Sequence, residues 1–191
     1  MPGTIYVAYG ERAKQETAKS AASLRRHNDL PIITIDETVF DRPGPGARWA
    51  KLNVDRLSPF DYTLYLDADT RVNGDVSAGF GMLGDGWDLL IAPSVNQGHE
   101  CFRHIGQIEN QATLDELENP FPLQLQAGVM FFHRERCARL FAAWRDEWLR
   151  FKGQDQAALL RALNREPVRV LLLGRAWNGG KLIEHLFGRA R

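Results

Sequence analysis

Short apolar runs alternate along the chain with longer segments in which apolar residues recur at helical spacing. The apolar runs are rich in β-branched and aromatic residues and end at Gly, Pro or Asp, which is typical of β-strands. They predict strands at residues 4–10, 31–37, 61–67, 87–94, 125–133 and 168–174. Helical spacing predicts helices at residues 11–26, 47–57, 134–151 and 154–164, with a shorter helix near 111–118.

The first predicted elements follow the order strand, helix, strand, helix, strand. This order is typical of an α/β fold with a mostly parallel, Rossmann-like central sheet flanked by helices. At 191 residues the chain is long enough for a substantial core, and we expect a single domain over residues 1–191. Such sheets bind ligands beyond the carboxyl ends of their strands, so polar residues at those ends are the first candidates for a site.

The composition narrows the classes of partner. The chain has 44% hydrophobic and 25% charged residues and a formal net charge of zero, which offers no broad attraction to nucleic acid or to an anionic membrane. No apolar run reaches the roughly 18 residues of a membrane span, and no secretory signal is recognisable. Cys101 and Cys137 form no CxxC pair and suit reduced thiols, so we expect a cytoplasmic protein.

Two carboxylates stand at the end of one predicted strand. The strand at residues 61–67 ends at Asp67, and Asp69 follows two residues later. Carboxylates this close repel each other and are costly to desolvate, and a shared cation relieves both effects. Paired carboxylates suit Mg²⁺ or Mn²⁺ and leave coordination positions for phosphate oxygens. In the alternative interpretation, one aspartate caps a turn and the other is solvated.

Four motifs, in this order along the chain, resemble the retaining GT-A glycosyltransferases of family 8, the group that contains glycogenin and the bacterial lipopolysaccharide galactosyltransferases. That family has a DxD sequence after a hydrophobic strand, an N-A-G-V segment, a D-Q pair that opens a helix, and a late H-x-x-G-x-x-K. The matching residues here are Asp67-Ala68-Asp69, Gln126-Ala127-Gly128-Val129, Asp155-Gln156 and His185-x-x-Gly188-x-x-Arg191. The resemblance covers nearly the whole chain and implies a GT-A fold and a nucleotide diphosphate sugar as donor.

The resemblance implies a metal and phosphate site. Asp67, Asp69 and His185 would hold Mn²⁺ (or Mg²⁺), because two oxygens and one imidazole nitrogen form a ligand set that Mn²⁺ accepts well. Gly188 would let the backbone approach the phosphates, and Arg191, in the position of the family's Lys, would bind a phosphate with its guanidinium group. Ala68 and Gly128 belong to the same donor-binding segments.

The resemblance also implies residues for the sugar and the nucleobase. Asp155 would bind sugar hydroxyls, and Gln156 would lie near the reacting anomeric carbon. Gln126 replaces the family's usual Asn and would donate to a sugar hydroxyl from an amide displaced by one methylene. Ala8 and Tyr9 match positions that contact the nucleobase, and Tyr9 would stack on uracil.

Three further candidates come from their places in the predicted fold. Gly10 stands where the family has an acidic residue, so Asp36, at the end of the second strand, is a candidate for the missing contact to the base or ribose. Arg48 and Lys51, on the helix before the DxD strand, could reach the diphosphate or the sugar. The alternative for both is a solvated helix face.

Three segments complete the expected site and core. Trp177 and Asn178 precede two glycines and form a loop that we expect to fold over the substrate. The polar residues 94–104 are expected to line the acceptor side. Trp144 and Trp148 recur at helical spacing and are expected in the core.

The predicted function is therefore metal-dependent transfer of a hexose from a UDP-sugar to a hydroxyl of a saccharide, a protein or a small molecule, with retention at the anomeric carbon.

Two alternatives stay open, as does the oligomeric state. A metal-dependent phosphatase of the haloacid dehalogenase type also has DxD after a strand, but it requires Thr or Val where this chain has Arg71, and it uses the first strand, not the third. A nucleotide-sugar binding module without transferase activity would keep the donor site and lack the acceptor site.

Overall fold

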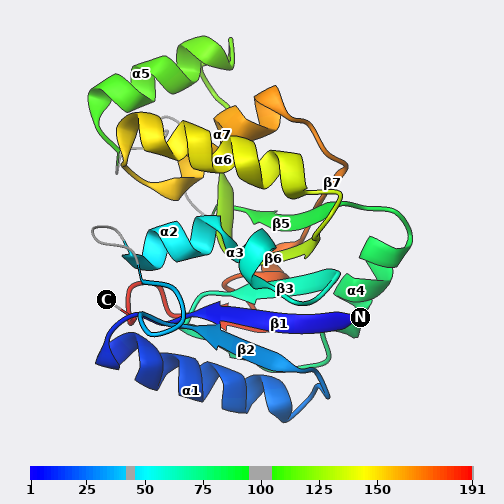
Figure 1. Ribbon diagram of the computed structural model, residues 1–191. Helices are drawn as coiled ribbons and strands as arrows, with labels where there is room; N and C mark the ends of the chain where they lie inside the picture. The colour runs from blue at the N-terminus through cyan, green and yellow to red at the C-terminus, as the bar shows by residue number, and fades with distance from the viewer. Residues whose placement is uncertain (42–45, 95–104, 191) are drawn as a thin grey trace.

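The computed structural model describes residues 1–41, 46–94 and 105–190. A six-stranded sheet has the strand order β2-β1-β3-β6-β5-β7, and β4 and β8 form a second, two-stranded sheet (Figure 1). The strands are β1 (Pro2–Val7), β2 (Ile32–Ile35), β3 (Tyr62–Leu66), β4 (Thr70–Val72), β5 (Leu89–Pro93), β6 (Leu125–His133), β7 (Val170–Leu172) and β8 (Ile183–His185). The helices are α1 (Glu11–Arg25), α2 (Gly46–Leu52), α3 (Val54–Leu57), α4 (Ser77–Gly84), α5 (Gln107–Glu116), α6 (Ala138–Phe151), α7 (Asp155–Arg165) and the 3₁₀ turn η1 (Arg175–Trp177).

The central sheet is mostly parallel, as the sequence predicts, and β6 is reversed within it. The pairs β1–β2, β1–β3 and β5–β7 are parallel, whereas β6 is antiparallel to both β3 and β5. Because β6 is reversed, its first residues lie at the edge where β1 and β3 end. Leu66 pairs with Val129, and the Asp67 amide donates to the Gly128 carbonyl at 2.8 Å. The start of β6 therefore reaches the same edge as the DxD motif.

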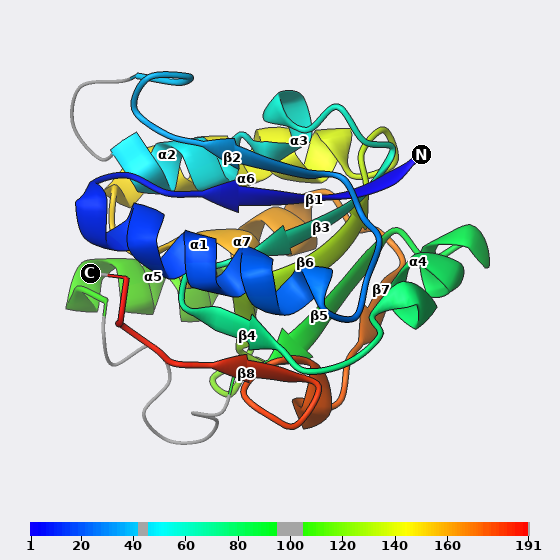
Figure 2. The ribbon, with the colours of Figure 1, turned by 90° about the horizontal axis from the view of Figure 1, so that it is seen from below.

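Side chains alternate between the two faces of the sheet and build a core on each. On β1, Ile5 and Val7 face one core, whereas Tyr6 faces the other. Helices α2, α3, α6 and α7 cover the first face, and α1, α4 and the small sheet of β4 and β8 cover the second (Figure 2). Trp144 and Trp148 of α6 are buried, which confirms their expected place in the core.

The structure differs from the predicted elements in several places. The helix expected at 47–57 is divided at Asn53 into α2 and α3, and the Asn53 side-chain amide donates to the Trp49 carbonyl at 2.8 Å. The helix expected near 111–118 begins earlier, at Gln107. Strands β4 and β8 have three residues each, too few for an alternating pattern to be recognised, and α4 contains glycines that disfavour a helix.

The structure adds two observations on membrane and thiol chemistry. No helix in the described part of the chain is both long and apolar enough to cross a membrane. Cys137 is a free, buried thiol, and burial raises its pKa to about 12, which keeps it protonated. Cys101 lies outside the described residues.

Candidate functional site

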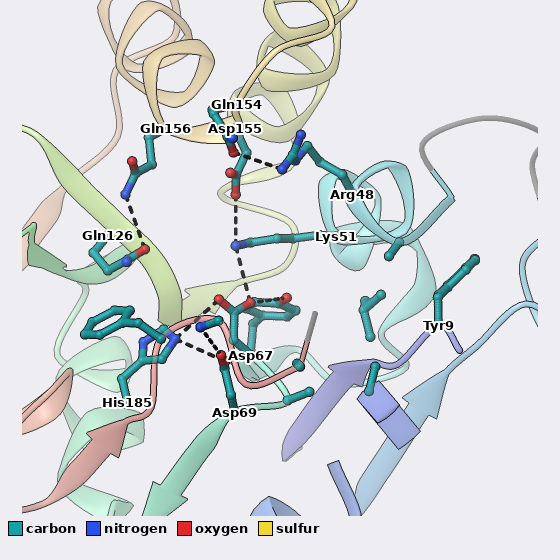
Figure 3. A pocket seen from close by; sticks show the side chains of 18 residues that line it. Tyr9, Arg48, Lys51, Asp67, Asp69, Gln126, Gln154, Asp155, Gln156 and His185 are labelled. Carbon is teal, nitrogen blue, oxygen red and sulfur yellow. Dashed lines mark hydrogen bonds and ion pairs between the residues drawn. The ribbon is translucent and has the colours of Figure 1, made fainter. Parts of the chain in front are cut away.

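A cavity of about 500 Å³ opens where β1 and β3 end (Figure 3). It is bounded by the end of β1, helix α2, the turn between β3 and β4, the start of β6, the start of α7 and the segment after β8. The sequence-predicted residues that line it are Tyr9, Arg48, Lys51, Asp67, Ala68, Asp69, Gln126, Asp155, Gln156, His185 and Gly188. The fold thus brings together side chains that are far apart in the sequence.

Asp67, Asp69 and His185 converge on one point of this cavity. One potential ligand atom from each residue lies within 4.8 Å of the others. His185 Nε2 is 3.2 Å from Asp69 Oδ1 and 3.8 Å from Asp67 Oδ2. The aspartates lie between β3 and β4, and His185 ends β8, where it pairs with Thr70 of β4. The short sheet that the sequence pattern does not predict is therefore the element that carries the histidine to the aspartates.

The chemistry of this cluster fits a divalent cation. Burial would raise the pKa of Asp69, but the hydrogen bond and charge of His185, together with backbone amides, outweigh burial and lower this pKa to about 2. Asp69 is therefore ionised at neutral pH, as a metal ligand needs to be. Two carboxylate oxygens and an imidazole nitrogen suit Mn²⁺, and carboxylates also suit Mg²⁺.

Gly128 leaves the space that the cluster needs. A Cβ at this position would overlap the imidazole Cε1 of His185 and would lie 2.8 Å from Asp67 Oδ2. The backbone of β6 passes directly beneath these two side chains, so a larger residue would displace at least one of them. Gly128 lies beneath the cluster and outside the cavity lining.

Lys51 extends from α2 into the cavity and joins two carboxylates. Its Nζ lies 2.9 Å from Asp155 Oδ2 and 3.4 Å from Asp67 Oδ1. Burial would lower the pKa of Lys51, but Asp155 and Asp67 outweigh it and raise this pKa above its ordinary value. Burial would raise the pKa of Asp155, but the charge and hydrogen bond of Lys51 keep it below its ordinary value. Lys51 is therefore a charged part of the site and not a member of a solvated helix face.

The start of α7 presents two of the predicted catalytic residues. Asp155 and Gln156 are its first two residues, and both side chains line the cavity. Gln156 Nε2 donates to Gln126 Oε1 at 3.4 Å (Figure 3). The two glutamine amides therefore lie side by side on the cavity wall, near the pair of Asp155 and Lys51.

Side chains from two other helices hold this end of α7 in place. Trp144 Nε1 donates to the Asp155 carbonyl at 2.8 Å, and Trp148 Nε1 donates to the Gly153 carbonyl at 3.0 Å. Arg48 Nη1 donates to the same Gly153 carbonyl at 2.8 Å. Helical spacing identifies the tryptophans as core residues but gives no sign of this second role, because the indole partners are Asp155, which begins α7, and Gly153 in the loop before it.

Tyr9 lies at the other end of the cavity from Gln126 and Gln156 (Figure 3). Its hydroxyl donates to the Phe40 carbonyl. Ala8 is fully buried and lies outside the lining. Asp36 also lies outside the lining, where its carboxylate accepts hydrogen bonds from the amide and hydroxyl of Thr38 at 2.9 and 2.6 Å and caps a turn.

Several contacts around the cluster are not apparent from the sequence. Tyr65 donates its hydroxyl to Asp67 Oδ1 at 2.6 Å. Phe187 stacks on His185, with ring centroids 4.0 Å apart. Gly188 adopts a φ of 86°, which favours glycine, and its amide donates to Asp69 Oδ2 at 2.7 Å.

Some predicted residues are not brought to the cavity, or are not described. The side chain of Asn178 is buried and contacts His185 from outside the lining, so it does not cover the cavity. Arg191 lies outside the described residues, as do residues 95–104 of the polar segment expected on the acceptor side.

No model of a known protein family matches the chain, and no curated protein sequence does. Solved structures share its fold at low identity. Mouse xyloside xylosyltransferase 1 aligns over 93% of this chain and 87% of its own, with 13% identity and a TM-score of 0.61. The galactosyltransferase LgtC, in complex with donor and acceptor sugar analogs, aligns over 93% and 75%, with 16% identity and a TM-score of 0.62. A glycosyltransferase involved in the glycosylation of the major capsid of PBCV-1 aligns over 99% and 96%, with 12% identity and a TM-score of 0.60. The chain therefore has the fold of the GT-A glycosyltransferases.

Proposed function

We propose that this protein is a metal-dependent glycosyltransferase of the family 8 type, which transfers a hexose from a UDP-sugar to an acceptor hydroxyl with retention. One observation carries the proposal: a candidate cation site and the side chains expected to bind the sugar line the same cavity. Asp67, Asp69 and His185 form the first, and Asp155 and Gln156 belong to the second. The LgtC structure holds donor and acceptor sugar analogs, which supports the same classes of ligand here.

The donor is proposed to lie along the cavity with its nucleobase near Tyr9 and its sugar near Gln126 and Gln156. Mn²⁺ bound by the Asp67, Asp69 and His185 side chains would stabilise the negative charge that develops on the leaving diphosphate. Lys51 lies between Asp67 and Asp155, so its ammonium group adds positive charge between the phosphate side and the sugar side.

The sugar is proposed to be held by side chains that are already ordered. One carboxylate oxygen of Asp155 contacts Lys51, and the carboxylate would accept hydrogen bonds from sugar hydroxyls. Gln126 and Gln156 fix each other through one amide hydrogen bond and retain amide groups for the donor. Such preorganised groups need little rearrangement when the substrate binds.

The carboxylates of the cavity support retention. Those among the described lining residues are Asp67, Asp69 and Asp155. The first two face the proposed cation, and the third is paired with Lys51. This part of the chain therefore presents no unengaged carboxylate that could activate the acceptor from the opposite face, as inversion requires. Proton NMR of the first-formed product tests this, and a product inverted relative to the donor would contradict retention.

The phosphatase alternative is less consistent with the site. Arg71, which stands in place of the required Thr or Val, forms an ion pair with Glu16 on α1. His185 and backbone amides lower the pKa of Asp69 to about 2, which disfavours a role for this carboxyl as a proton donor at neutral pH. The binding-module alternative makes a different prediction, because a module would bind the donor without turnover.

Thermal unfolding with UDP, GDP, ADP or CMP, each with Mn²⁺ or with EDTA, tests the donor site. UDP at about 100–1,000 times its dissociation constant is expected to stabilise the protein by about 3–4 kcal/mol, and only with Mn²⁺. Asp69→Asn should abolish the effect, and Asp146→Asn, at an exposed position, should keep it. If no nucleotide raises the melting temperature, the proposal is wrong. If UDP does so but no UDP-hexose is consumed with saccharide, peptide or small-molecule acceptors, the protein is a binding module.

A further inference from the structure

Asn178 contacts His185 on the side away from the aspartates. The residue is 4% exposed and follows η1. Its Oδ1 lies 2.8 Å from His185 Nδ1, and its Nδ2 donates to the Gln126 carbonyl at 3.2 Å. One buried amide thus joins the candidate metal-binding histidine to the strand that carries a candidate sugar-binding residue.

The chemistry of these partners determines where each hydrogen lies. A backbone carbonyl only accepts, so the NH₂ group of Asn178 faces Gln126 and its Oδ1 faces the imidazole. An amide oxygen also only accepts, so the hydrogen between Asn178 and His185 belongs to His185 Nδ1. In the neutral imidazole, Nε2 then carries the lone pair. That lone pair faces the same point as the two carboxylates.

The backbone around Asn178 holds its side chain in place. The backbone N–H of Asn178 donates to the Arg175 carbonyl at 3.2 Å. The backbone N–H groups of the next two residues donate to the Ile183 carbonyl at 2.9 and 3.1 Å. Trp177 packs edge-on against Phe131 of β6, with ring centroids 5.5 Å apart. The turn is therefore attached both to β8, which carries the histidine, and to β6.

We propose that Asn178 is a positioning residue of the metal site, which fixes the tautomer and the ring plane of His185 so that Nε2 faces the cation. Metal-binding histidines commonly donate their other N–H to such a partner, and loss of the partner weakens metal binding by about 10–100-fold. The inference rests on the metal site of the proposed function and adds a residue that does not touch the metal or the substrate. It also gives His185 and the backbone of Gln126 a common support.

The tautomer is tested directly on the wild-type protein. Long-range ¹H–¹⁵N NMR with ¹⁵N-labelled histidine and Zn²⁺, a diamagnetic ion that imidazole and carboxylates bind, reports the two ring nitrogens separately. We expect the proton on Nδ1 and the metal on Nε2 of His185. A metal on Nδ1, or a proton on Nε2, would overturn the proposal.

The energetic role is tested by Mn²⁺ titration, followed by the EPR signal of free Mn²⁺, without any nucleotide. Asn178→Leu should bind Mn²⁺ about 10–100-fold more weakly, whereas Asn178→Asp, which keeps an acceptor for Nδ1–H, should stay within about threefold of the wild type. Asn164→Leu, at an exposed asparagine of α7, should bind as the wild type does.

The outcomes separate the two proposals. Wild-type affinity in a folded Asn178→Leu protein would contradict a positioning role, as would absence of Mn²⁺ binding by the wild type. If Asn178→Leu fails to fold, the tautomer of the wild-type protein decides. Mn²⁺ binding that depends on Asn178, without any stabilisation by a nucleotide, would support the positioning role and reject the proposed function.

Discussion

The Nζ of Lys51 lies 2.9 Å from Asp155 Oδ2, and the two side chains are only 12% and 13% exposed. The pair joins α2 to the first residue of α7. A carboxylate at this position would also be stabilised by the N-terminus of its own helix, but the ammonium group determines where its oxygen points. The contact therefore orients the residue expected to hold the sugar before any ligand arrives.

Replacement of Lys51 by Met is expected to destabilise the protein by about 3 kcal/mol, because it leaves Asp155 as a buried charge without its partner. Urea unfolding measures this change. The double variant with Asp155→Asn should recover more than half of the loss, since the unpaired charge is then removed. Equal stability of the single and double variants would show that the pair is not the source of the effect.

Gly128→Ala is expected to weaken Mn²⁺ binding by at least about tenfold, because the added methyl group displaces His185 or Asp67. Far-UV circular dichroism should show an intact fold, and Mn²⁺ titration gives the affinity. Gly81→Ala is the matched control, since a Cβ there meets nothing within 4 Å. Equal affinities in the two variants would contradict the close approach of β6 to the cluster.

Asp69 should make the stability of the metal-free protein depend on pH in the acidic range. Its folded-state pKa of about 2 lies below the ordinary value, so its contribution is complete above pH 4 and is lost as the pH falls toward 2. Asp69→Asn should therefore be less stable than the wild type by roughly 2 kcal/mol at pH 5 and by nearly nothing at pH 2. If Asp69→Asn were still less stable than the wild type at pH 2, the loss would come from altered packing or hydrogen bonding and not from the charge of Asp69.

Loss of the Arg161 side chain of α7 is expected to destabilise the protein strongly. Its side chain is fully buried and pairs with Glu147 and Glu109 at 3.1 and 3.2 Å. Arg161→Met leaves both carboxylates without this partner and should cost about 3–5 kcal/mol in denaturant unfolding. Arg165→Met, at a position that is 52% exposed, should change stability by less than about 0.5 kcal/mol. Similar losses in the two variants would contradict the role of burial.

The sequence predicts those features that depend on residues adjacent along the chain. The apolar residues before Asp67 predict a strand, and the position of the aspartates at its end predicts a site at the edge of the sheet, where the cavity lies. The reversal of β6 is not predicted from alternation, because a strand has the same pattern in both directions. Its direction matters, since it places Gly128 against Asp67.

The partners that support the site cannot be predicted from spacing, because they depend on how distant segments pack. Tyr65 is an unremarkable strand residue until its hydroxyl is seen on Asp67. From the sequence, Asn178 is expected in an exposed loop because its side chain is polar, yet the side chain is buried against His185. The three-residue strand that ends at His185 forms because β4 supplies its pairing partner.

The central position of strand β6 also affects how the protein unfolds. In the strand order β2-β1-β3-β6-β5-β7, it is the hydrogen-bonded link between a three-stranded N-terminal group and the pair formed by β5 and β7. A fluctuation that detached β6 would divide the sheet into two pieces and separate Gly128 from Asp67 in the same event. Opening of the site and disruption of the sheet are thus coupled, so the amides of β6 should exchange with solvent only in the largest unfolding events.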